Sequence, residues 1–177
     1  MDAVLLLRSA NVGGRNLLKS ADVVKGLAKA GIKAASQGAS GNFVLRGIAS
    51  HRASEAALAK LLPYRAEIIQ RSGKEIARLV DSRPFDDQPA REDIKWQVSF
   101  LKSEGKILPT LPLVSPAGSD WRVNAFKLAG RDLLSRYRVV EGKPFDINRL
   151  VEKEFGVSAT TRTWNTVLAI GRLLAEN

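Results

Sequence analysis

The beginning of the fold is decided by the stretch LLLRSANVGGRN at residues 5–16. Its apolar residues, together with Val4, have the length of a buried strand, and the arginine and paired glycines after them predict a loop. Ser20 then offers the side chain of a helix N-cap, and apolar residues repeat at helical spacing beyond it. The stretch therefore predicts a strand over Val4–Leu7, a glycine-rich loop and a helix.

The residues that follow predict two strands, a second helix and a further strand. Ile32–Ser36 and Phe43–Ile48 are strand candidates separated by a Ser-Gly-Asn turn, in which we expect Gly41 to have a positive φ. Ser54 is the expected cap of the second helix, and Glu67–Arg71 is the expected last strand. This βαββαβ order is that of a ferredoxin-like plait. Right-handed crossovers then predict a four-stranded antiparallel sheet with both helices on one face.

A second unit is expected beyond a polar segment that contains proline and adjacent aspartates at residues 86–89. We place one domain at residues 1–85, comprising the plait and a helix over Lys74–Asp81, and a second at residues 86–177. The elements expected in the second domain are a strand over Trp96–Leu101, a proline-rich loop or edge strand over Lys106–Gly118, a hairpin of Trp121–Leu128 with Leu133–Val140, and helices over Phe145–Phe155 and from about Arg162 to Leu174. The predicted fold is α+β, with the plait packed on a second, degenerate α/β unit.

Composition limits the classes of protein that this chain can represent. It has 177 residues, 28 basic and 18 acidic, with a net charge of +10 shared by both halves. The absence of cysteine excludes disulfides, thiolate nucleophiles and Cys-based zinc sites, and with His51 as the sole histidine we expect no metal site. No apolar run approaches the roughly 20 residues that span a bilayer. We expect a soluble cytoplasmic protein without a membrane partner, and the charge favours polyanions or is simply a solvated surface.

A second signature lies near the end of the chain, in the stretch TTRTWNT at residues 160–166. With the start at residues 5–16 and the Ser40-Gly41-Asn42 turn, it resembles a bacterial family, the domain-of-unknown-function family 1697. Members of that family read like LLRGINVGGKN, QSGNVVF and TxRNWNT at the corresponding places. The chain departs from this pattern at Ala39, where the family has glutamine, and at Thr163, where it has asparagine. The resemblance covers nearly the whole chain and implies plait-like halves. It carries no established activity, and the cofactors are unknown.

The glycine-rich loop is the first candidate binding site. Paired glycines allow backbone amides to point into a common space that accepts an anion, and the helix that follows adds positive potential at its N-terminus. Alternatively, the glycines and asparagines only satisfy the geometry of a tight loop. The candidate ligand-binding residues at this end of the sheet are Arg8, Asn11, Gly13, Gly14, Asn16, Ser40 and Asn42.

The second candidate site is the signature at residues 160–166, with Arg162, Trp164 and Asn165 as its ligand-binding residues. Thr161 is the expected N-cap of the last helix, which places Arg162 and Asn165 three apart on one helical face at its positive end. A donor pair there suits a carboxylate or phosphate of a ligand. The alternative is that these residues clamp two domains together.

The predicted hairpin of the second half carries the highest density of basic residues, and Arg136 and Arg138 share one face by the period of two. Such a sheet could bind a phosphate backbone, although the first sheet lacks the aromatic residues of an RNA-binding plait. The candidate nucleic-acid-binding residues are Arg122, Lys127, Arg131, Arg136 and Arg138.

No spacing in the sequence identifies a nucleophile or a general base, so the catalytic residues are unknown. The favoured function is a binding module for an anionic partner, either a phosphorylated metabolite or nucleic acid. Two alternatives stay open: a transferase or hydrolase acting on a phosphorylated or carboxylated small molecule, and a protein-interaction scaffold. The oligomeric state is not predicted.

Overall fold

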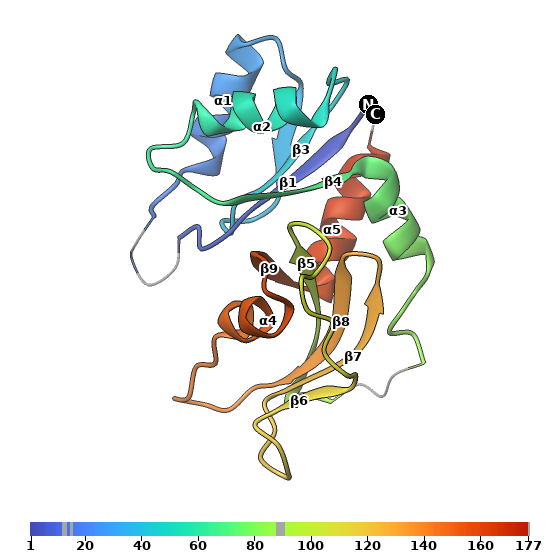
Figure 1. Cartoon of the computed structure of the whole chain (residues 1–177). Coiled ribbons are helices and arrows are strands. Elements are labelled where there is room, and N and C mark those ends of the chain that lie inside the picture. Colours follow the sequence, from blue (N-terminus) through green and yellow to red (C-terminus); the bar gives the residue numbers. More distant parts are fainter. Residues whose placement is uncertain (12–13, 15, 88–90, 177) are drawn as a thin grey trace. The chain divides into compact units, whose positions relative to one another are not determined.

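The computed structural model describes residues 1–11, 14, 16–87 and 91–176 (Figure 1). The chain divides into two compact units, one formed by Met1–Ser82 with Thr166–Asn177 and the other by Arg83–Asn165. Each unit has its own antiparallel sheet. The mixed α+β class expected from the sequence is therefore confirmed.

The first unit contains the βαββαβ order that the sequence predicted. Its sheet has the strand order β2-β3-β1-β4, with every neighbouring pair antiparallel. The elements are β1 (Ala3–Leu7), α1 (Ser20–Lys29), β2 (Ala34–Ser36), β3 (Asn42–Leu45), α2 (His51–Ala59), β4 (Ile68–Ser72), α3 (Gly73–Asp81) and most of α5 (Trp164–Ala175).

Strand β1 is central in this sheet and is buried along its whole length. Leu5 and Leu7 pack in a core with Val23 and Leu27 of α1 and with Leu58 of α2, so both helices cover one face. Alternate strand residues point to opposite faces. Val4 and Leu6 are also fully buried, which explains why β1 is apolar at every position rather than at every second one.

The caps of α1 and α2 differ from the sequence predictions. Ser50, not Ser54, caps α2, because the Ser50 hydroxyl accepts a hydrogen bond from the Ala53 amide at 3.1 Å. Ser54 lies inside the helix with its side chain buried, where it donates to the His51 carbonyl and accepts from Gln70. Ser20 is the first residue of α1 rather than its cap, which is Lys19.

The C-terminal end of α5 is held by Arg46, which follows β3. The Arg46 guanidinium donates hydrogen bonds to the carbonyl oxygens of Leu173, Leu174 and Glu176 and pairs with the Asp2 carboxylate at 3.4 Å. The last carbonyls of a helix have no partner within the helix and carry partial negative charge. Arg46 therefore satisfies them and fastens the end of α5 to the first sheet.

We expect Arg46→Ala to lower the free energy of unfolding of the protein by about 2 kcal/mol, because several charge-assisted hydrogen bonds are lost together. Urea unfolding followed by far-ultraviolet circular dichroism measures this change. Arg46→Lys is the control, since it keeps the charge but cannot reach all three carbonyls, and it should fall between the two proteins. An Arg46→Ala protein as stable as the parent would contradict this role.

The second unit contains β5 (Ile94–Leu101), β6 (Leu113–Ser115), β7 (Val123–Ala129), β8 (Asp132–Arg138), α4 (Ile147–Phe155) and β9 (Ala159–Thr163). The strand order is β6-β7-β8-β5-β9. Helix α4 covers one face through Val151 and Phe155, which pack with Leu101, Val123 and Leu133. The predicted hairpin is present as β7 and β8, and the proline-rich segment supplies an edge strand, β6.

The prediction that the last helix begins at about Arg162 was wrong. Residues 159–163 form strand β9, which pairs with β5, and α5 begins at Trp164. Thr161 is therefore no N-cap: its hydroxyl lies 2.7 Å from the hydroxyl of Ser99, its cross-strand partner. Three β-branched threonines in five residues favour this pleated, partly buried position.

Candidate functional site

The loop after β1 is tied to the turn before β3 by Asn11. Its amide nitrogen donates to the carbonyl oxygens of Leu18 at 3.0 Å and Ala39 at 2.6 Å, and its amide oxygen accepts from the Leu18 backbone at 2.7 Å. Asn16 donates to the Ser9 carbonyl at 3.2 Å. The two asparagine side chains thus form hydrogen bonds within the loop and to the neighbouring turn. This favours the interpretation that Asn11 and Asn16 stabilise the loop rather than bind a ligand.

The other candidates of this site lie at the same end of the first sheet. Leu6 pairs with Asn42, so the end of β1 and the start of β3 are neighbours. Asn42 is buried and donates to the Gln37 carbonyl, Arg8 donates to the Ser9 hydroxyl at 2.7 Å, and Ser40 is exposed. Gly14 has a φ of +73° with open space where a side chain would be, and Gly13 lies outside the described residues.

The candidates from the second signature belong to the second unit, so we treat them as a separate site. Arg162 lies in β9 with a side chain that donates to the Thr160 hydroxyl at 2.7 Å and to the Thr161 carbonyl at 3.0 Å. Only 8% of its surface is exposed, and this burial lowers the pKa of the guanidinium to about 10. Arg162 and Asn165 do not share a helical face, because one is on a strand and the other in the helix after it.

Trp164 and Asn165 instead line a small pocket of about 170 Å³ at the start of α5. Lys95 and Trp96 of β5 and Thr163 of β9 also line this pocket. The pocket has one cationic side chain, one amide and two indole rings. Such walls fit the flat apolar face of a ring that carries a negative group.

An aromatic cluster borders this pocket and was not predicted from the sequence as a unit. The Phe85 ring lies 5.2 Å from Trp96, 6.2 Å from Phe126 and 5.1 Å from Trp164, measured between ring centroids. Phe85 is buried, whereas Trp96, Phe126 and Trp164 are half-buried. The sequence predicted the strand that contains Trp96, but the partners of Trp96 in this cluster come from three other segments.

The basic hairpin contains arginines of two kinds. Arg122 is 9% exposed and donates to the Arg138 carbonyl at 3.0 Å, the Tyr137 hydroxyl at 2.8 Å and the Lys143 carbonyl at 2.7 Å. Its guanidinium also lies over the rings of Tyr137 and Phe145. Arg122, predicted to contact nucleic acid, thus has its guanidinium directed into the unit.

Arg136 and Arg138 instead lie over the indole of Trp121, with their guanidinium carbons 4.8 and 4.2 Å from the ring centroid. Arg136 is the cross-strand partner of Trp96, so the two share one face of the sheet. Lys127 is exposed and on that same face, opposite Leu134. Leu133, which alternates with these residues, packs toward α4, so this is the face away from α4.

We call the surface formed by Trp96, Trp121, Lys127, Arg136 and Arg138 the Arg–Trp face. Arg131, the last of the predicted basic residues, is at the hairpin turn and donates to the Lys102 carbonyl at 3.0 Å. Within the part of the chain that the structure describes, no group of three or more His, Cys, Asp or Glu side chains could hold a metal ion. In the same residues, no helix has the length and apolar character needed to cross a membrane.

Comparison with known proteins gives a fold relative and a family. A conserved bacterial protein from Streptococcus pneumoniae has a similar structure, with a TM-score of 0.63, 18% sequence identity and 98% of each chain covered. That likeness shows a shared fold. No match was found among curated proteins. The family model described as "Protein of unknown function (DUF1697)" matches residues 1–123, and the chain therefore belongs to this family.

Proposed function

We propose that the protein is a binding module for an anionic partner, and that the partner is single-stranded nucleic acid bound on the Arg–Trp face. The observation that carries this proposal is the stacking of Arg136 and Arg138 on Trp121, beside Trp96 on the same sheet face. An aromatic ring holds a guanidinium in place while the N–H groups that have no protein acceptor can still donate to a ligand. Arg138 is fixed further because it donates to the Ser119 carbonyl at 2.8 Å. A pair of arginines fixed in this way suits successive phosphate groups.

The neighbouring half-buried tryptophans supply the second element of such a site. Proteins that bind single strands combine a basic surface with aromatic rings on which bases stack, and each stacked base contributes about 1–3 kcal/mol. Trp96 and Trp164 line the pocket of about 170 Å³, whose rim includes Lys95. A strand with a base in this pocket and a phosphate at Arg136 would cross β5, because Thr163 of the pocket lies in β9 on one side of β5 and Arg136 lies in β8 on the other.

The test is binding of a fluorescein-labelled oligothymidine strand by anisotropy, repeated at several salt concentrations. A single strand gives a log–log slope of about −0.7 for each phosphate contacted, so the Arg136→Ala, Arg138→Ala double variant should flatten the slope by about 1.4. The matched control is Lys25→Ala with Lys29→Ala, which removes the same charge from exposed positions of α1. The control should change the slope far less. Binding through phosphate contacts is strongest at low salt, so the absence of binding at about 25 mM salt would refute the proposal.

A phosphorylated metabolite in the pocket beside Trp164 is the second candidate, because Lys95 and Asn165 offer donors there near the positive end of α5. Titration with a mononucleotide separates the two functions. If Lys95→Ala and Asn165→Ala weaken mononucleotide binding and the double arginine variant does not, the ligand is the metabolite. The cytoplasmic location expected from the composition is part of the same proposal.

A further inference from the structure

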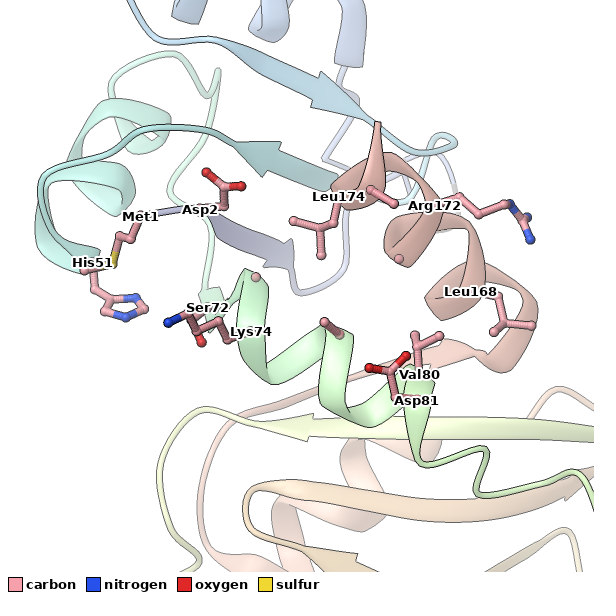
Figure 2. Close-up of a pocket in the computed structure, with 14 residues that line it drawn as sticks. Met1, Asp2, His51, Ser72, Lys74, Val80, Asp81, Leu168, Arg172 and Leu174 are labelled. Carbon is pink, nitrogen blue, oxygen red and sulfur yellow. The ribbon is translucent and has the colours of Figure 1, made fainter. Parts of the chain in front are cut away.

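The first unit has a groove of about 900 Å³ between α3 and α5 (Figure 2). None of the residues that line it was discussed as part of an anion site. Its walls come from Lys74 to Asp81 on α3 and from Leu168 to Ala175 on α5, and Met1, Asp2 and His51 lie at one end. The volume is within the range of small-molecule sites.

The side chains that line the groove are predominantly apolar, and several of them are short. Ala77 and Val80 contribute from α3, and Leu168, Leu174 and Ala175 contribute from α5. The two helices approach closely at Gly171, where an added Cβ would lie 3.1 Å from a methyl group of Val80. Close helices with small side chains leave a long apolar trough rather than a filled interface, because little side-chain volume projects into it.

A positive charge lies at the end of the groove where α3 begins, because Lys74 is there with the His51 imidazole near it. His51 is the first residue of α2 and Lys74 the second residue of α3, and Figure 2 shows their side chains at the same end. Each helix N-terminus adds a partial positive charge to these side chains. The nearby Asp2 carboxylate is engaged by Arg46 and by the Gly47 amide at 3.1 Å, whereas Asp81 and Arg172 lie toward the other end.

We propose that this groove binds a free, unbranched fatty carboxylate, with the carboxylate at Lys74 and His51 and the acyl chain along the apolar trough. Seven helical steps separate Lys74 from Asp81, a length of about 10 Å, which suits a chain of medium length. Charge complementarity selects the anion, because the apolar trough alone would accept an alcohol or a cationic amphiphile equally well.

The test uses three probes of equal chain length, decanoate, decanol and decyltrimethylammonium, each titrated into the full chain by isothermal calorimetry. We expect decanoate to bind most tightly and the cation to bind at least about tenfold more weakly, the difference expected for a charge-assisted contact. Lys74→Glu should weaken decanoate by a similar factor and leave decanol unchanged. Lys25→Glu, an equal charge reversal at an exposed position of α1, should change neither.

A second variant tests the location. Ala77 is exposed on α3, so Ala77→Trp fills the trough without disturbing the core and should abolish binding of decanoate and decanol alike. Equal affinities of the three probes, or an Ala77→Trp protein that binds as the parent does, would overturn the proposal. The proposal would also be overturned if sedimentation showed that Ala77→Trp disrupts a dimer, because a second copy of the chain would then fill the groove. Binding of the protein to anionic vesicles without binding to free decanoate would overturn it as well.

Discussion

Replacing Gly41 by alanine is expected to lower the free energy of unfolding by about 2–4 kcal/mol, the sum of a backbone and a steric cost. Gly41 has a φ of +70°, a conformation that residues with a Cβ adopt only under strain. The added Cβ would lie 2.7 Å from the Cβ of Leu7 and 2.9 Å from that of Ala10. Atoms so near the backbone of the buried end of β1 cannot move aside as the end of a flexible side chain can.

Gly38 provides the matched control for this prediction. It has a φ of +63°, similar to that of Gly41, but an added Cβ would meet nothing within 4 Å. Gly38→Ala should therefore cost only the backbone term, about 1–2 kcal/mol. Urea unfolding of the parent and both variants gives the comparison. Equal losses for Gly38→Ala and Gly41→Ala would show that the contact with Leu7 and Ala10 has no energetic consequence.

Features that depend on local chemistry were predicted correctly. The positive φ of Gly41 follows from the turn residues around it, and β1 follows from an apolar run of strand length. The shared face of Arg136 and Arg138 follows from the period of two, and the register of β8 confirms it. Each of these inferences needs only the residues within one element or turn.

Features that depend on distant partners could not be predicted. Residues 159–163 have capping chemistry that suits a helix start, but pairing with β5 makes them a strand, and the Ser99–Thr161 contact joins residues 62 apart. This pairing cannot be predicted from the segment alone, because the same threonine hydroxyls can bond a helix amide or a group on a neighbouring strand. The groove between α3 and α5 is equally hidden, since its walls are far apart in the sequence.

The candidate sites show the same division. The sequence places Arg122, Arg136 and Arg138 in one basic hairpin, and nothing local distinguishes them. The structure separates them by their partners: Arg122 donates to backbone and side-chain oxygens inside the unit, whereas Arg136 and Arg138 lie over Trp121. We therefore predict a role in stability for Arg122 and a role in binding for Arg136 and Arg138, although all three are arginines.

Arg122→Ala is expected to lower the free energy of unfolding by about 3 kcal/mol, because it leaves three partly buried acceptors without this donor and removes stacking on two rings. The acceptors are the carbonyl oxygens of Arg138 and Lys143 and the hydroxyl of Tyr137. Arg122→Lys should recover less than half of this loss. A single ammonium group lacks the planar fork that donates in several directions while stacking on an aromatic face.

The same two variants separate structure from binding when oligonucleotide affinity is measured where all proteins are folded. Arg122→Ala should keep the affinity of the parent within about twofold, because its guanidinium is not directed at a ligand, whereas Arg136→Ala should lose about one phosphate contact from the salt slope. Thermal unfolding should give the opposite ranking, with Arg136→Ala close to the parent. If Arg122→Ala reduced affinity as strongly as Arg136→Ala and left the melting temperature unchanged, its guanidinium would have to face the ligand, against the hydrogen bonds that direct it into the second unit.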